Sequence, residues 1–229
     1  MIRVESLSRL IAEVARSLQA EQGSGDTMDL AVTLAVEIVD GAEDAAITLV
    51  HRDRIIETPA STSEAAQQAD RIQQELGVGP CLTALREEDV VSCPDLATEE
   101  RWGQWGPRTA AEAGIGSMLC FRMFTQKERL GALSLYAAQP RAFTGADVES
   151  GLSFAAHTAI AIAVARQDEN MDIALDSRSL IGQATGIVMD RYDIDAVRAF
   201  AVLRRISQQS NVKLHEVAVE LIRTRHLPA

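Results

Sequence analysis

The sequence predicts an α+β protein, in which an antiparallel sheet flanked by helices is followed by a long connecting helix and a C-terminal three-helix bundle. Short strand-like runs, separated by polar and loop-forming residues, occupy residues 45–138. Strands grouped in this way, with helices at the ends, are typical of an α+β domain. No proline lies between Pro140 and Pro228, and the apolar residues there keep a helical spacing. This pattern predicts helix almost to the C-terminus.

Two helices are expected within residues 1–40. The apolar residues of the first helix are Leu7, Leu10, Ile11, Val14 and Leu18, which lie at helical spacing. The break GSGD at residues 23–26 separates it from a second helix that carries Leu30, Leu34 and Ile38. Charged residues interrupt the first apolar pattern, which excludes a secretory signal peptide because the core of such a peptide is uncharged.

The sheet is expected from five strand-like runs. AAITLVH, RIIET and DVVS come first, and the runs at residues 117–124 and 129–137 flank a short polar loop, as in a β-hairpin. Between the early strands and this hairpin we expect a helix in ADRIQQEL and a loop-rich stretch that contains Pro80, Pro94, Trp102 and Trp105. The two tryptophans are expected to pack this loop over the sheet, although they could also line a ligand pocket.

The long helix that begins near residue 147 admits two interpretations. Leu152, Ala159, Arg166, Ile173 and Leu180 recur every seven residues, with Ala155 and Ile162 at companion positions. This seam could join two copies of the chain as a parallel coiled coil, or residues 147–165 could pack on their own sheet. The uncharged run at residues 150–165 is too short to span a bilayer comfortably, so no membrane partner is expected.

Charge is distributed unevenly along the chain. The net charge is −11, yet residues 178–229 contain eight Arg or Lys against five Asp or Glu. This basic end divides into three amphipathic helices. One break lies near Asp193 or Asp195, either of which can cap the second helix, and the other lies at residues 210–212. The acidic average therefore does not exclude a nucleic-acid partner for the C-terminal end.

The C-terminal residues carry a specific family resemblance. The run Ile181 to Met189, IGQATGIVM, follows Arg178, and Ala199-Phe200, Leu203-Arg204, Asn211, Leu214, Val217 and Ala218 come after it in order. With these pieces the segment resembles the ANTAR domain, the RNA-binding output module of bacterial transcription antitermination regulators. Thr185 departs from the family pattern, which commonly has Lys at this position.

A second resemblance covers roughly residues 40–165. IQQELGVGPCLTALRE, CPDLATEERWGQW and AAEAGIGSMLCFRM are similar to the GAF sensor domains that are joined to ANTAR modules in actinobacterial regulators. GAF domains bind diverse small molecules or none, so the resemblance implies a domain that senses a signal, with a possible small-molecule ligand, or that mediates dimerisation. The Asn-Lys-x-Asp signature of cyclic-nucleotide-binding members is missing. The two resemblances divide the chain into a GAF-like sensor domain at 1–165, a helical linker at 166–177 and an ANTAR domain at 178–229.

The ANTAR resemblance implies a cytoplasmic protein that binds tandem RNA stem-loops in nascent transcripts and prevents a transcription terminator from forming. A two-hairpin target favours a homodimer, because tethering two weak sites raises the overall affinity. The residues expected to contact RNA are Arg178, Gln183, Thr185, Gly186, Arg191, Arg204 and Lys213. Gly182 or Gly186 would allow close approach of RNA or close helix packing, whereas Met189, Phe200 and Leu203 are expected in the core.

No enzymatic chemistry, metal site or cofactor is expected. The three cysteines show no CxxC spacing, and the four histidines show no metal-ligand spacing. Cys81 has no neighbouring histidine in the sequence to activate it, so an inert thiol is expected. Two alternative functions remain open: a DNA-binding helix-turn-helix-like regulator, and a sensor or scaffold dimer that binds no nucleic acid.

Overall fold

The computed structural model describes residues 12–21, 23–50, 56–86, 88–126 and 128–227. The chain divides into two compact units, Met1–Arg166 and Gln167–Ala229. The expected first helix is confirmed over residues 12–20, where Val14 and Leu18 are buried. The other apolar residues predicted for this helix, Leu7, Leu10 and Ile11, lie outside the described residues.

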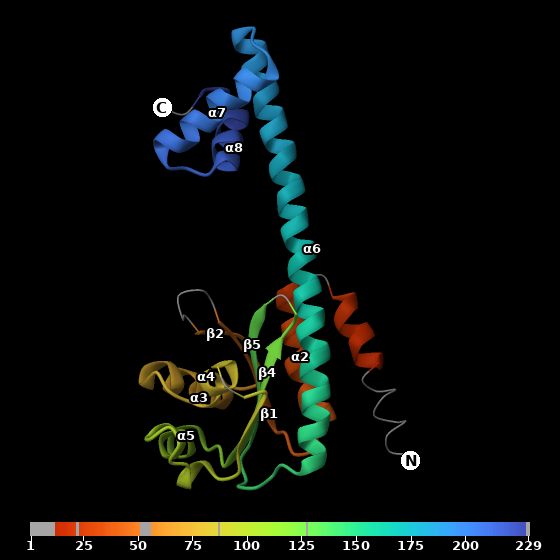
Figure 1. Cartoon of the computed structure of the whole chain (residues 1–229), viewed down its shortest axis with the longest axis vertical. Helices are drawn as coiled ribbons and strands as arrows, with labels where there is room; N and C mark the ends of the chain where they lie inside the picture. The colour runs from red at the N-terminus through yellow and green to blue at the C-terminus, as the bar shows by residue number, and fades with distance from the viewer. Residues whose placement is uncertain (1–11, 22, 51–55, 87, 127, 228–229) are drawn as a thin grey trace. The chain divides into compact units, whose positions relative to one another are not determined.

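A five-stranded antiparallel sheet forms the centre of the first unit (Figure 1). Its strands are β1 (Asp44–Val50), β2 (Ile56–Ser61), β3 (Val90–Cys93), β4 (Ser117–Phe124) and β5 (Arg129–Ala137), in the order β2-β1-β5-β4-β3. β4 and β5 form the expected hairpin, in which Phe121 pairs with Leu133. The α+β prediction with an antiparallel sheet is confirmed.

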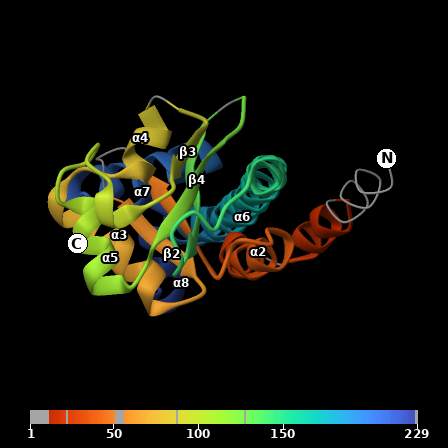
Figure 2. The same ribbon diagram turned by 90° about the horizontal axis from the view of Figure 1, so that it is seen from below.

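Helices cover both faces of this sheet (Figure 2). One face carries α2 (Ser24–Ile38) and the first part of α6 (Gly145–Tyr192), and the other carries α3 (Glu64–Leu76), α4 (Pro80–Arg86) and α5 (Trp105–Ala113). Along β4, Leu119 and Phe121 belong to the first of these cores, and Met118 and Cys120 to the second. Successive side chains of a strand point to opposite faces, so a sheet covered on both faces requires this continuous apolar run.

The first part of α6 packs on the sheet. Ala155, Ala159 and Ile162 are buried in the same core as Phe121. Of the two interpretations of the seven-residue seam, packing on the chain's own sheet is therefore confirmed at these positions. By length and composition alone α6 could cross a membrane, but 39% of its most apolar window is buried inside the protein. Core helices of soluble proteins pass the same test, so this is weak evidence for a membrane span.

The prediction of a loop-rich stretch after α3 is partly wrong, because α4, the 3₁₀ turn η1 (Leu96–Thr98) and α5 form there. Pro80 occupies the first position of α4, where its fixed φ suits a helix. Helices of seven and nine residues are too short to show a clear apolar period in the sequence. Trp102 and Trp105 are buried against each other edge to face, which confirms that they pack this segment over the sheet.

The second unit is a three-helix bundle made of the second half of α6, α7 (Ala196–Ser210) and α8 (Leu214–Thr224) (Figure 1). Its core consists of small and branched apolar side chains: Ala184, Val188, Ala199, Leu203, Val217, Ala218 and Leu221. Of the two predicted caps, Asp195 is the one that begins α7, because its carboxylate accepts a hydrogen bond from the backbone N–H of Arg198 at 2.8 Å. Asn211 ends α7 in the left-handed conformation. The three predicted helices are confirmed.

Candidate nucleic-acid interface

A groove of about 640 Å³ lies between the three helices of the second unit. It is lined by Arg178, Ile181, Gly182, Thr185, Gly186, Met189, Ala196, Phe200 and Leu214. The residues from α6 lie at positions i, i+3, i+4, i+7, i+8 and i+11 counted from Arg178, which places them on one helix face. The turn at Asp193–Asp195, closed by a hydrogen bond from Ile194 N–H to Met189 O at 3.3 Å, brings α7 beside this face.

Gly182 and Gly186 form an open part of this groove. Both are exposed, and a Cβ atom built on either glycine would meet no atom of the described chain within 4 Å. The interpretation that these glycines serve close helix packing is therefore wrong for packing against the described residues of this chain. The space above them is free for a molecule that the chain itself does not supply.

Thr185 lies in the groove with its hydroxyl already engaged. The Thr185 hydroxyl donates to the backbone carbonyl of Ile181 at 2.7 Å, one turn earlier in α6. Its proton is therefore not available for a phosphate, whereas its oxygen can still accept a hydrogen bond from a sugar hydroxyl or an amine. At the position where the ANTAR resemblance leads us to expect Lys, Thr185 therefore offers a hydrogen-bond acceptor and no charge.

The cations of the second unit are largely unpaired. Among the eight Arg and Lys of residues 178–229, Arg198 pairs with Asp195 and Arg223 pairs with Glu220. The other six form no ion pair within the described part of the chain: Arg178, Arg191, Arg204, Arg205, Lys213 and Arg225. Unpaired guanidinium and ammonium groups on one small unit provide the electrostatic attraction that phosphates require.

The predicted RNA contacts occupy different places relative to the groove. Arg178, Thr185 and Gly186 line it. Lys213 is the N-cap residue of α8 directly before the lining residue Leu214, and Arg204 follows the lining residue Phe200 by one turn of α7. These two residues lie next to the groove along the chain.

The other two predicted contacts, Arg191 and Gln183, do not line the groove either. Arg191 comes two residues after Met189, which turns it by roughly 200° around α6. Gln183 is exposed, and its side-chain amide donates to the Ser179 hydroxyl at 3.4 Å.

Phe200 is the residue that sequence reasoning placed wrongly. Leu203 is buried as predicted, but Phe200 is 40% exposed and lines the groove. Ala199, Leu203 and Ile206 lie on the core side of α7, and a residue next to Ala199 is turned from that side by about 100°. From this offset the sequence could have indicated that Phe200 lies away from the core side of α7. Met189 packs against the core and also lines the groove.

The first unit contains a buried polar cluster around Asp70 on the sheet face covered by α3 and α4. Its carboxylate accepts hydrogen bonds from Thr58 at 2.7 Å, Thr48 at 2.9 Å and the Tyr136 hydroxyl at 3.4 Å. Burial raises the pKa of Asp70 above its ordinary value, although these hydrogen bonds oppose the shift. The cluster ties α3 to the sheet, where a buried polar group must be paired.

The cysteines show the features of inert thiols. Cys81, Cys93 and Cys120 are all free and buried. Burial raises the pKa of the Cys93 thiol to about 12, which keeps it in the unreactive thiol form. Within the described residues, no group of three or more His, Cys, Asp or Glu is arranged to hold a metal ion.

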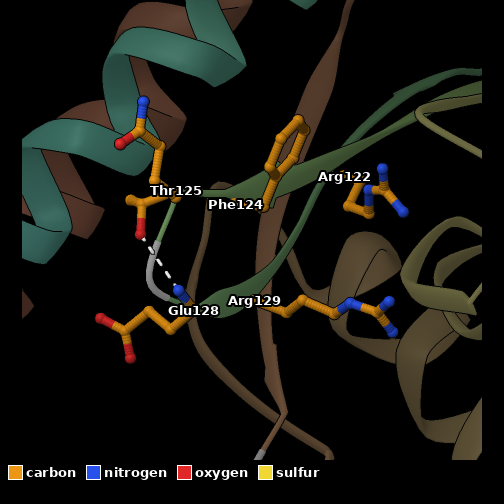
Figure 3. Close-up of a pocket in the computed structure, with 6 residues that line it drawn as sticks. Arg122, Phe124, Thr125, Glu128 and Arg129 are labelled. Atoms are coloured by element: carbon orange, nitrogen blue, oxygen red, sulfur yellow. Dashed lines mark hydrogen bonds between the residues drawn. The ribbon is translucent and has the colours of Figure 1, made fainter.

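A second hollow of about 410 Å³ lies at the tip of the β4–β5 hairpin (Figure 3). Arg122 and Arg129 extend to the same side of the hairpin there. Arg122 pairs with Asp89 and stacks over the Phe124 ring at 4.7 Å, and Arg129 donates to the backbone carbonyl of Leu85 at 3.3 Å. Because both guanidinium groups already have partners in the chain, this hollow is a weaker anion site than the groove.

Comparisons with known proteins agree with both resemblances of the sequence. The family model for the GAF domain matches residues 21–163, and the model for the ANTAR domain matches residues 169–222. No curated protein matches the chain.

Solved structures share the fold of the first unit at low identity. The GAF domains of phosphoenolpyruvate-protein phosphotransferases from Acinetobacter and Coxiella burnetii both have a TM-score of 0.56 over 72% of this chain, with 16% and 17% identity and 98% and 96% of those chains covered. The photosensory core module of a Stigmatella aurantiaca phytochrome has a TM-score of 0.60 and 12% identity over 90% of this chain and 45% of its own. Such similarities establish the fold alone.

Proposed function

Because this chain belongs to the GAF domain family and carries an ANTAR domain after its GAF domain, we propose that it is a transcription antitermination regulator. Its ANTAR domain binds tandem RNA stem-loops in a nascent transcript, and its GAF domain responds to a small molecule. The protein acts in the cytoplasm as a homodimer. In this proposal residues 1–165 are the sensor, 166–177 the helical linker and 178–229 the RNA-binding domain.

The observation that carries this proposal is the set of six cations in the second unit that form no ion pair with the described residues, five of them within the ANTAR match at 169–222. An arginine or lysine that neutralises a phosphate releases condensed counterions, and this release drives the sequence-independent part of nucleic-acid binding. The remainder of the chain is strongly acidic, with 28 Asp or Glu against 14 Arg or Lys in residues 1–177. Repulsion of RNA by that part favours binding at the basic unit.

The linker connects the two functions through continuous backbone. α6 runs without interruption through residues 166–177. A conformational change in its first part, which packs on the sheet, can therefore be transmitted to the ANTAR residues of the same helix. Ala155 and Ile162 anchor that first part in the sheet core. A ligand that alters this packing in the GAF domain would change the helix that carries Arg178 and Thr185.

RNA binding is tested with the full-length protein and a library of RNAs, each with two hairpins in tandem and randomised loop nucleotides. At low salt, where phosphate contacts are strongest, the protein should retain a subset of this library. Duplex DNA of matched sequence serves as the competitor. Tighter, sequence-selective binding to the duplex would favour a helix-turn-helix-like regulator, and no binding to either would favour a sensor or scaffold.

A matched pair of substitutions on α7 tests the role of the unpaired cations. Arg204→Ala removes an unpaired guanidinium, and we expect weaker RNA binding and a salt dependence reduced by about one phosphate contact. Arg198→Ala removes the guanidinium that already pairs with Asp195, so its effect on RNA binding should be smaller. Equal effects of the two substitutions would contradict this assignment. Thermal unfolding of both variants should stay close to the wild type, because both side chains are exposed.

A further inference from the structure

Nothing in the described part of the chain requires a glycine at position 182 or 186. Glycine is a poor helix former, yet both glycines lie inside α6. Neither adopts a left-handed conformation, and a Cβ atom at either position would meet open space. Alanine would therefore fit at both positions and would favour the helix. The missing side chains leave depth in the groove, which suggests that something outside the chain uses it.

The chemistry of the groove limits what this occupant can be. Ile181, Met189 and Leu214 supply apolar surface, and Phe200 presents a partly exposed aromatic ring. Arg178, a cation without an ion-pair partner in the described residues, lies in the same lining. An occupant that satisfies all of these groups has a flat apolar face and a negative charge next to it.

We propose that the groove receives one nucleobase that is unstacked from an RNA hairpin loop. The face of the base packs against Phe200 and Met189 above the two glycines, and its phosphate meets Arg178. The Thr185 oxygen, whose proton is directed to Ile181 O, accepts a hydrogen bond from the base or from a ribose hydroxyl. This inference rests on the proposed function and adds the residues that receive a loop base.

Charge complementarity favours a nucleotide over an apolar side chain of a second copy of the chain. An apolar side chain in the groove would remove Arg178 from water without offering it a partner, which is costly. A nucleotide brings its own phosphate to that guanidinium, and the unpaired Arg204 and Lys213 lie next to lining residues where the neighbouring phosphates would pass. Splayed loop bases stacked on aromatic side chains are the usual means of specific RNA recognition.

The first test introduces side chains at Gly186 that occupy part of the groove. Gly186→Ala and Gly186→Leu add side chains of increasing size in a position with free space, so both variants should fold at least as stably as the wild type. Their affinity for RNAs selected from the tandem-hairpin library should fall in the order glycine, alanine, leucine. Analytical ultracentrifugation of the free variants accompanies this measurement. A change of oligomeric state with unchanged RNA affinity would assign the groove to a protein interface and overturn the proposal.

The second test removes the stacking surface. Phe200→Ala should weaken RNA binding by roughly 5- to 140-fold, the usual range for loss of one aromatic stacking partner. Val197→Ala is the matched control, because Val197 is an exposed apolar residue of the same helix outside the groove, and it should bind as the wild type does. Thermal unfolding of both variants separates lost binding from lost folding, and Phe200→Leu repeats the test with an apolar side chain that keeps most of the volume.

A double-mutant cycle identifies the base. Each loop nucleotide of a selected RNA is replaced in turn by an abasic one. At one position the loss should match that of Phe200→Ala, and combining the two changes should cost no more than either alone. If wild-type protein binds the RNA but all Gly186 and Phe200 variants bind equally well, this inference is wrong and the proposed function stands. If wild-type protein retains no member of the library at low salt, the proposed function itself fails.

Discussion

Replacing Gly186 with alanine should stabilise the second unit. A Cβ atom at this position meets no atom of the described chain within 4 Å, so no contact opposes the substitution. A glycine inside a helix costs about 0.5–1 kcal/mol relative to alanine, and the free energy of unfolding should rise by this amount. If residues 167–229 unfold as a separate unit, the Tm of that transition should rise by about 2–8 °C.

Replacing Gly151 with alanine should instead lower the free energy of unfolding. Gly151 also lies in α6, but there a Cβ atom would collide with the ring of Phe121, which is fully buried. Overpacking of this kind costs about 1–3 kcal/mol, which exceeds the gain in helix propensity. The substitutions Gly186→Ala and Gly151→Ala in the same helix therefore distinguish the effect of helix propensity on stability from the effect of packing.

Urea unfolding followed by far-UV circular dichroism measures both changes. Amide hydrogen exchange then assigns each change to its unit, because protection in residues 182–190 should rise with Gly186→Ala and stay unchanged with Gly151→Ala. A lower free energy of unfolding for Gly186→Ala would refute the reasoning. It would mean that another part of this chain occupies the space above the glycine.

Three further predictions concern stability. Since burial raises the pKa of Asp70, the folded state holds this proton more tightly than the unfolded chain. The stability of the wild type relative to Asp70→Asn should therefore fall as the pH rises above about 4, by at most about 1.4 kcal/mol per pH unit, and a flat difference in denaturant unfolding would contradict this. Asp195→Ala removes the cap of α7 and should cost about 1 kcal/mol, whereas the exposed Asp190→Ala should change the same unfolding free energy by less than about 0.5 kcal/mol. Leu203→Ala empties a fully buried core position and should cost about 2–5 kcal/mol; a loss below about 1 kcal/mol in thermal or chemical unfolding would show that Leu203 is not part of the core.

Much of the fold was predictable because its signals are local. The β4–β5 hairpin and the end of α6 at Tyr192 lie where strand-like runs, breaks and helical spacing placed them. The cap of α7 needed only the choice between Asp193 and Asp195. α4 and α5 were missed, because in helices this short tertiary packing decides the conformation and propensity contributes little.

The candidate interface was predictable only in part. Arg178, Thr185 and Gly186 share the groove because helical spacing on α6 already places them on one face. Phe200 comes from a different helix, and its exposure depends on how α7 is turned against α6 and α8. Whether Phe200, Arg191 or Gln183 faces the groove follows from this packing, to which the local sequence gives only a weak indication.

The sequence alone determined the α+β class, the order of the elements, the basic C-terminal end and both family resemblances, because periodicity, composition and motif spacing are properties of neighbouring residues. Only the tertiary structure decided what Gly182 and Gly186 are next to, since an empty space is defined by residues distant in the chain. It also decided which cations lack partners, because an ion pair such as Arg223 with Glu220 requires coordinates and cannot be read from charge counts. Open space and unpaired charge exist only after the helices have packed, and these two features carry the proposed RNA interface.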